Sequence, residues 1–325
     1  MNIKLWDQLF REGIISPGSH AKIKLADNNK LVSVHWEIKM ILYLGVLLLS
    51  SGLGILVYKN IDTIGHQVIL LLIALVCAGS FVYCTRHKLP FSTRKVQAPH
   101  TFFDYVLLLA CSMFIIFIAY LQYQYNVFGS RYGLATFFPM VVLFFSAYYF
   151  DHFGILALAI TTLAAWVGIT ITPLHILESN DFNSGRVILT GLFLGVFLLL
   201  SGWATRNKQF KAHFEFTYNN FGVHIMLISG LAAMFHFVPY LPWFLLTAAA
   251  VYFFYLKAFK ERSFYFLLIV TLYAYIAASY VFMDLVMRMS GSGIGPFYIG
   301  FLYFIGSGLG LVFFLINANK KIKAA

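Results

Sequence analysis

Charged residues are scarce in this sequence, and their scarcity excludes an ordinary soluble domain. Only 11% of the 325 residues are charged, whereas 61% are hydrophobic. Soluble domains carry about 25% charged residues, which keep their surface in water. A chain with so few charges must place most of its surface in lipid. Its 35 phenylalanines and 20 tyrosines are typical of helices that meet acyl chains and headgroups.

Cysteines and catalytic motifs are also sparse. Cys77, Cys84 and Cys111 lie inside or at the ends of apolar segments, without CxxC or histidine spacing, so they indicate neither a metal site nor a disulfide framework. The sequence contains no Walker lysine loop, GxSxG elbow, HExxH or paired-carboxylate pattern. We therefore predict that the protein is not an enzyme and has no catalytic, cofactor-binding or metal-binding residues, and no cofactor.

Long apolar runs dominate the sequence that remains. A helix needs about 20 apolar residues to cross the hydrocarbon core, and these runs are continuous rather than alternating as barrel strands are. The fold class predicted is all-α, a polytopic bundle of about ten transmembrane helices. The expected spans are approximately 40–58, 66–84, 102–123, 132–150, 153–172, 187–205, 221–237, 240–257, 264–284 and 296–318.

Two places in this series of spans are tight. Only Asp151-His152 interrupts the apolar stretch Tyr132–Thr172, so two crossings there require a two-residue turn. The runs at 221–237 and 240–257 are short and are joined by Val238–Pro242. They could form a shallow hairpin instead of two crossings, which would lower the count to about eight or nine.

Positive charge is distributed unevenly among the loops. Of the 23 lysines and arginines, all but Lys59, Arg131, Arg186 and Arg288 lie before the first span, in the second, sixth and eighth loops, or in the tail. Cytoplasmic loops carry such an excess, so we expect a multi-pass protein of the bacterial inner membrane with both termini in the cytoplasm. Because the basic residues lie in short loops, the net charge of +11 does not indicate nucleic acid. The expected partner is the lipid bilayer.

The first 35 residues form a separate module in this prediction. Leu5, Leu9 and Phe10 share one face of an expected helix that Gly13 ends, and Ser16-Pro17 offers a cap and first turn for a second helix. The predicted organisation is a cytoplasmic helical module at 1–35, a transmembrane bundle at 36–318 and a basic cytoplasmic tail at 319–325. The module is expected either to anchor on the membrane surface or to bind a protein partner.

The amino-terminal segment resembles a known family. A module that reads Leu9-Phe10-Arg11-Glu12-Gly13-Ile14-Ile15-Ser16 precedes a first span that ends in Gly52-Leu53-Gly54-Ile55-Leu56-Val57-Tyr58, and the link Lys59-Asn60-Ile61-Asp62-Thr63-Ile64-Gly65-His66 follows. Over about residues 5–85, this is similar to the bacterial membrane proteins grouped as domain of unknown function 2157. In related sequences a Trp often follows the Asn of the link, where this chain has Ile61. The resemblance implies an integral membrane protein and supplies no activity.

Ionisable residues deep in a bilayer are costly and often mark functional sites. None of the 12 carboxylates lies at the centre of an expected span. Asp284 and Arg288 are four residues apart and form a candidate polar pair on one helical face. Asp104, Tyr273 and Tyr280 are the candidate cavity-lining residues if the protein is a transporter.

Glycines gather in the first and last spans. Both spans contain Ser-Gly-Leu-Gly, and small residues let helix backbones approach closely in lipid. We expect these two spans to pack on each other, or one of them to act as a hinge beside a transport path. The candidate packing or hinge residues are Gly52, Gly54, Gly300, Gly306, Gly308 and Gly310.

Two functions are consistent with these patterns. The absence of charge at the centre of the expected spans, together with short loops and a small cytoplasmic module, favours a structural, regulatory or assembly role in the membrane. The alternative is a small-molecule transporter built from two five-span halves, since an odd number of spans in each half would invert the topology as inverted repeats require. A polar cavity near mid-membrane would favour the transporter.

Overall fold

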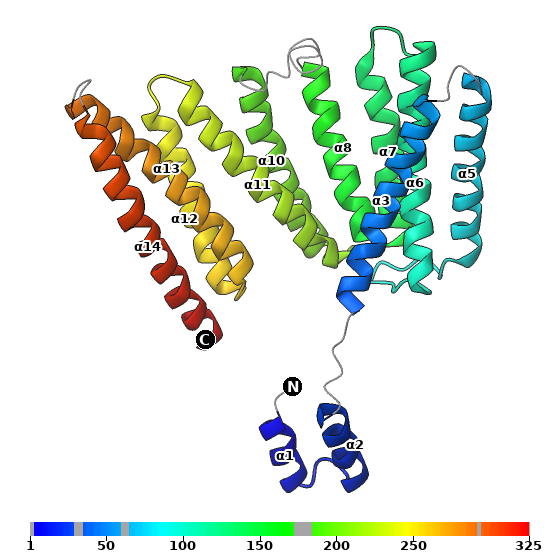
Figure 1. Ribbon diagram of the computed structural model, residues 1–325, viewed down its shortest axis with the longest axis horizontal. Helices are drawn as coiled ribbons and strands as arrows, with labels where there is room; N and C mark the ends of the chain where they lie inside the picture. The colour runs from blue at the N-terminus through cyan, green and yellow to red at the C-terminus, as the bar shows by residue number, and fades with distance from the viewer. Residues whose placement is uncertain (1–2, 29–34, 60–64, 172–183, 291–293, 325) are drawn as a thin grey trace. The chain divides into compact units, whose positions relative to one another are not determined.

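The computed structural model describes residues 3–28, 35–59, 65–171, 184–290 and 294–324. These residues are almost entirely helical, and no strand occurs among them (Figure 1). The elements are α1 (Ile3–Arg11), α2 (Pro17–Asn28), α3 (His35–Lys59), α5 (His66–His87), α6 (Thr101–Tyr125), α7 (Tyr132–Phe150), α8 (Phe153–Ile171), α10 (Gly185–Asn207), the 3-10 turn η1 (Ala212–Phe214), α11 (Glu215–His236), α12 (Leu241–Lys260), α13 (Phe264–Ser290) and α14 (Gly295–Ala324).

The chain divides into two compact units, Met1–Thr63 and Ile64–Ala325. In the first unit, α1 and α2 lie where the sequence predicts two short helices. Gly13 separates them with a φ of +72°, a left-handed conformation that glycine adopts without steric cost. The Ser16 hydroxyl caps α2 by accepting a hydrogen bond from the Ser19 N–H at 3.3 Å. The His20 ring stacks on Phe10 at 4.3 Å and its Nε2 lies 2.8 Å from an Asp7 oxygen.

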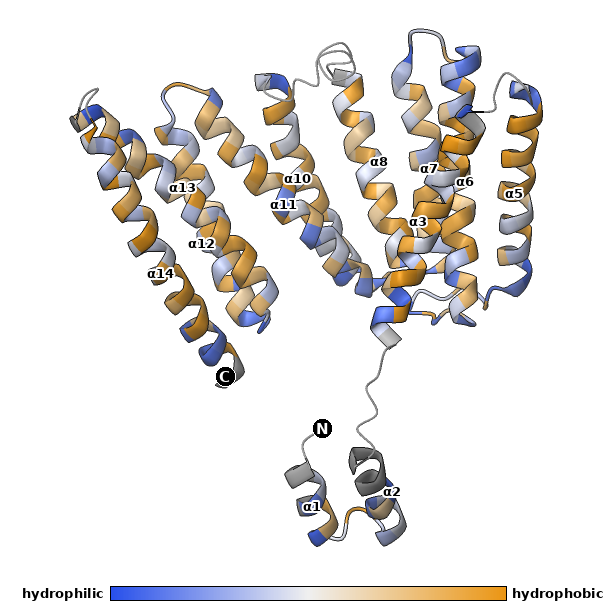
Figure 2. Ribbon diagram, in the orientation of Figure 1, coloured by the Kyte–Doolittle hydropathy of each residue, from blue (hydrophilic) through white to orange (hydrophobic). Residues whose placement is uncertain are grey.

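Nine helices of the described residues are long and apolar enough to cross a membrane: α3, α5, α6, α7, α8, α10, α12, α13 and α14. Hydrophobic residues run along their middles and hydrophilic residues gather at their ends (Figure 2). This is the pattern that a hydrocarbon layer between two polar headgroup regions imposes. The all-α polytopic fold expected from the sequence is therefore confirmed.

The remaining long helix, α11, has 22 residues but is less apolar. It runs antiparallel to α10 over the full length of α10 (Figure 1). A Cβ on Gly202 would meet Asn219, one on Gly195 would meet Met226, and one on Gly185 would meet Phe237. A helix that packs along a transmembrane helix from end to end crosses the same hydrocarbon layer. The position of α11 therefore favours two full crossings, α11 and α12, over a shallow hairpin.

Half of α11 is buried inside its unit, which explains its composition. Thr217, Tyr218, Asn219 and Ser229 are buried, and a polar group shielded by other helices can be satisfied by them instead of by lipid. The helix also begins at Glu215, several residues before the apolar run at 221–237. Its first turns are therefore polar, and an apolar run alone could not reveal them.

The α7–α8 connection is the two-residue turn that the sequence indicates. Asp151 ends α7 in a left-handed conformation, with φ 61° and ψ 48°. Aspartate tolerates this region better than most residues. His152 then caps α8, because its Nδ1 accepts a hydrogen bond from the Ile155 N–H at 3.2 Å. The two helices pack against each other, with Leu143, Ala147, Leu156 and Ile160 in the largest hydrophobic cluster.

Candidate functional site

Charged side chains are concentrated where α5, α7, α10 and α12 finish, which we call the basic end. Asp151 is the centre of one group there. Its carboxylate lies 2.9 Å from Lys211 Nζ and contacts His213 Nε2, and it accepts a hydrogen bond from the Val96 N–H at 2.5 Å. The exposed fractions of the side chains are 2% for Asp151, 1% for Lys211 and 15% for His213. We call these three residues the Asp151 cluster.

Lys211 joins the Asp151 cluster to the segment between α5 and α6. Its backbone N–H donates to the Thr93 carbonyl at 2.7 Å, and its Nζ lies 3.4 Å from the Arg94 carbonyl and 5.1 Å from the centroid of the Phe91 ring. Removing an ammonium group from water is costly, and a carboxylate, carbonyls and an aromatic face offset that cost. Three connections that are distant in sequence are thus held together at one end of the bundle.

Asp104 lies at the same end, beside the turn that Asp151 begins. It is in the first turn of α6, where a negative charge interacts favourably with the helix dipole. The Nε2 of His152 is 3.7 Å from its carboxylate, and the exposed fractions of these side chains are 7% for His152 and 14% for Asp104. Asp104 therefore takes part in a contact between the start of α6 and the start of α8.

An open cleft of about 980 Å³ lies between α10, α11 and α12 at the basic end. Arg206 bridges two acids across it, with 3.3 Å to Glu215 and 3.4 Å to Glu261, and Lys257 is 3.8 Å from Glu261. We call this space the α10–α12 cleft. Its lining residues are Trp203, Arg206, Asn207, Gln209, Glu215, Phe253, Leu256, Lys257, Lys260 and Glu261.

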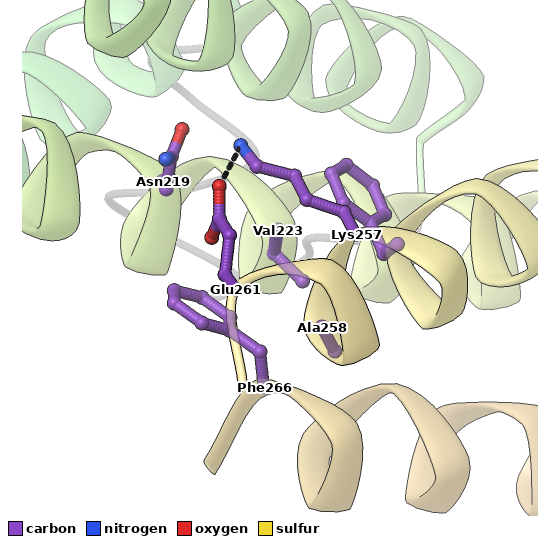
Figure 3. A pocket seen from close by; sticks show the side chains of 7 residues that line it. Asn219, Val223, Lys257, Ala258, Glu261 and Phe266 are labelled. Atoms are coloured by element: carbon purple, nitrogen blue, oxygen red, sulfur yellow. Dashed lines mark ion pairs between the residues drawn. The ribbon is translucent and has the colours of Figure 1, made fainter. Parts of the chain in front are cut away.

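A small cavity of about 10 Å³ shares Lys257 and Glu261 with the cleft. Figure 3 shows their ion pair, with Asn219 and Val223 of α11 nearby and Phe266 of α13 on the other side. A volume of this size holds about one water molecule. The space available to a ligand is therefore in the cleft and not beneath it.

Two of the three candidate cavity residues, Tyr273 and Tyr280, pack against the same hydrophobic cluster of Leu231, Met234 and Ala277. Tyr273 is hydrogen-bonded to His224 Nδ1 at 2.8 Å. Tyr280 packs against Phe235 and Tyr240, with ring centroids at 4.7 and 5.6 Å. Neither these two tyrosines nor Asp104 line the α10–α12 cleft. That they would line a transport cavity stays a prediction.

The candidate polar pair lies at the far end of α13 from Phe264. Arg288 Nε is 2.9 Å from Asp284 Oδ2, and the exposed fraction is 68% for the Arg288 side chain and 24% for that of Asp284. Arg288 also lies over the Tyr240 ring, 5.8 Å from its centroid. This exposed pair within one helix contrasts with the buried Asp151 cluster, which joins separate segments.

Glycines of α10 make close contacts with α11, and Gly300 is the one candidate position where an added Cβ would meet another described residue. On α10, a Cβ at Gly195 would lie 2.8 Å from the Met226 backbone nitrogen of α11, and one at Gly191 would overlap the Ser229 hydroxyl. A Cβ at Gly300 would meet Met283 at 3.0 Å. At the other candidates a Cβ would meet nothing within 4 Å in the structure, as holds for Gly52, Gly54, Gly306, Gly308 and Gly310. Contact between α3 and α14 concerns two separate units and stays a prediction.

The sequence analysis missed Asp151, Lys211 and His213. The available signal was the Asp151-His152 interruption, a single acid and a histidine in a long apolar stretch. It identified a turn but not the partners of the acid. Among the described residues, no group of three or more His, Cys, Asp and Glu side chains is placed to hold a metal ion.

Comparison with known proteins finds a family match over the amino-terminal part of the chain. Residues 7–156 match the model of the family described as Predicted membrane protein (DUF2157). No curated protein and no solved structure matches the chain. The family match begins in α1 and extends past the Asp151 turn into α8. The resemblance seen in residues 5–85 is therefore confirmed by a match to this family that extends over residues 7–156.

Proposed function

We propose that the protein is a non-enzymatic component of the bacterial inner membrane with a structural, regulatory or assembly role. The observation that carries this proposal is the position of the buried charges and what they contact. Asp151 and Lys211 are almost fully buried, and they tie three connections together at the ends of helices. Ion-coupled carriers more often place such groups at mid-membrane, where substrate and ions bind.

The amino-terminal helices are the proposed contact for a protein partner. α1 and α2 hold each other through Phe10, His20 and Asp7, so the pair is formed before any partner binds. Both termini are placed in the cytoplasm in this proposal, because the loops of the basic end carry most of the positive charge. The pair would then be available to cytoplasmic proteins.

A transporter is the second candidate, and one observation favours it. α11 carries polar groups away from the helix ends, including the His224–Tyr273 hydrogen bond at 2.8 Å. The α10–α12 cleft opens at one end of this helix. In a carrier, the centre of α11 would be exposed to water from each side in turn.

Water access to the centre of α11 separates the two functions. Leu227 is 1% exposed and lies in a hydrophobic cluster with Val223 and Phe254. The variant Leu227→Cys is to be treated with an impermeant maleimide, in spheroplasts and in inverted vesicles. Gln209→Cys, a position that lines the cleft, is the positive control for access from the basic end.

The structural role predicts that Leu227→Cys resists labelling in both preparations, while Gln209→Cys reacts in one of them. Labelling of Leu227→Cys from the side opposite to Gln209 would contradict the structural proposal. It would show that the bundle opens around α11 as a carrier does.

A further inference from the structure

Two helices of the α10–α12 cleft present the same order of side chains. On α10, Trp203 is followed one turn later by Arg206. On α12, Phe253 and Leu256 are followed by Lys257 and Lys260. Residues three, four and seven positions apart share one helical face. Each helix therefore lines the cleft with an apolar part and, toward its carboxyl end, a basic part.

The apolar part of the cleft belongs to the lipid-facing surface. The exposed fractions are 62% for Trp203, 62% for Phe253 and 50% for Leu256. Tryptophan is enriched where hydrocarbon meets headgroups, and Trp203 lies about one turn from the end of α10. An acyl chain can lie along these side chains without leaving the bilayer.

The basic part of the cleft keeps positive charge after its internal pairs are formed. Arg206 and Lys257 are paired with Glu215 and Glu261. Lys260 is exposed at the end of α12 and makes no ion pair with any described residue. Arg206 itself is 59% exposed at its side chain, so its guanidinium still has donors available on the open side.

We propose that the α10–α12 cleft binds a phospholipid with an anionic headgroup. The phosphate lies between Arg206 and Lys260, and the first part of the acyl chains lies against Trp203, Phe253 and Leu256. A cleft of about 980 Å³ accommodates a headgroup and the adjoining chain segments, since ligand sites typically measure about 300–1,000 Å³. Basic pockets between transmembrane helices are suited to anionic headgroups. A water-soluble anion would use only the polar half.

The test uses the full chain purified in a neutral detergent, with lipid binding followed by native mass spectrometry. Phosphatidylglycerol and phosphatidylcholine are titrated separately, with glycerol 3-phosphate as the soluble competitor. The charge variant is Lys257→Gln with Lys260→Gln. Its control is Lys320→Gln with Lys321→Gln, which removes two exposed lysines from the end of α14.

The wild-type protein is expected to bind phosphatidylglycerol at least tenfold more tightly than phosphatidylcholine. The charge variant should lose about thirtyfold in affinity for phosphatidylglycerol, because each basic residue near the surface contributes about 1 kcal/mol to binding anionic lipid. The control variant should stay within about twofold of the wild type. A substitution of the apolar wall, Trp203→Ala, should weaken both lipids.

Equal loss in the charge and control variants would overturn the site, since it would show a general surface effect. Competition by glycerol 3-phosphate as strong as that by phosphatidylglycerol would overturn the lipid assignment in favour of a soluble phosphate ester. If the double variant melts below the wild type, Lys260→Gln alone is used, because no ion pair to a described residue is lost. A wild-type affinity in that variant would also overturn the proposal.

Discussion

At the scale of single residues, Asp151 combines a backbone role with an electrostatic one. Its left-handed conformation ends α7, and its carboxylate receives Lys211, His213 and the Val96 N–H. Asparagine would keep the conformation, because its side chain also tolerates this region. It would remove the negative charge. The substitution therefore separates the two roles.

We expect Asp151→Asn to lower the free energy of unfolding by about 3 kcal/mol or more, because Lys211 would stay buried without its counter-ion. The matched control is Asp284→Asn, which breaks a pair whose arginine is 68% exposed and should cost about 1 kcal/mol or less. Denaturant titration of both variants in the same detergent measures the difference.

Adding Lys211→Met to Asp151→Asn should recover part of the lost free energy of unfolding. Similar costs for Asp151→Asn and Asp284→Asn would contradict the buried pair.

The sequence shows Asp151 but cannot show its surroundings. A lone acid at a break in an apolar stretch is visible, and it correctly marked the α7–α8 turn. Lys211 and His213 lie in a basic loop, and such residues are usually solvated. Lys211 is buried against the segment between α5 and α6, where the carbonyls of Thr93 and Arg94 accept hydrogen bonds from it. That contact depends on tertiary structure and has no local signal.

At the scale of elements, α10 and α11 show how glycine directs helix packing. Gly191 and Gly195 are four residues apart on α10, and both face α11. Such spacing lets two backbones approach in lipid. Gly222 of α11 lies on the other side of this contact, where an added Cβ would be 3.1 Å from the Gly195 carbonyl oxygen.

Gly195→Ala and Gly308→Ala form a matched pair of predictions. A methyl group at Gly195 would be 2.8 Å from the Met226 backbone, so we expect a loss of about 1–3 kcal/mol from overpacking. A methyl group at Gly308 would meet nothing within 4 Å. Alanine there should be neutral or stabilise α14 by up to about 1 kcal/mol through its helix propensity. Melting temperatures in detergent decide between them, and a loss confined to Gly308→Ala would reverse the assignment.

The sequence identified which helices exist better than it identified their neighbours. Continuous apolar runs located all ten of the long helices described from α3 to α14, and they gave the first residue of α7 and of α8. For α11, the apolar run was too short to distinguish a full crossing from a shallow hairpin, because the helix also contains polar residues that other helices shield. Glycine content drew attention to the first and last spans, although glycine only permits a close approach. Which backbone approaches depends on the topology.

At the scale of the whole molecule, contacts among the loops support the alternation of the spans. The segment before α6, the α7–α8 turn and the segment before α11 meet around Asp151. Arg206 at the end of α10 reaches Glu261 after α12. The α5–α6, α10–α11 and α12–α13 connections were assigned to one face from their positive charge, and the α7–α8 turn, which has no lysine or arginine, was assigned to the same face from the alternation of the spans. The structure brings them to one end of the bundle through side-chain contacts that do not depend on that charge count.

The final prediction concerns the side of the membrane that the basic end faces. Gln97, before α6, is exposed at the basic end, and Val127, between α6 and α7, is 56% exposed at the opposite end of α6. The native Cys77, Cys84 and Cys111 are buried, so labelling of introduced cysteines has little background. The excess of lysine and arginine favours the cytoplasm for the basic end. In spheroplasts, an impermeant maleimide should therefore label Val127→Cys, and should label Gln97→Cys only after lysis. The reverse pattern would invert the orientation, and labelling of both from outside would contradict a full crossing by α6.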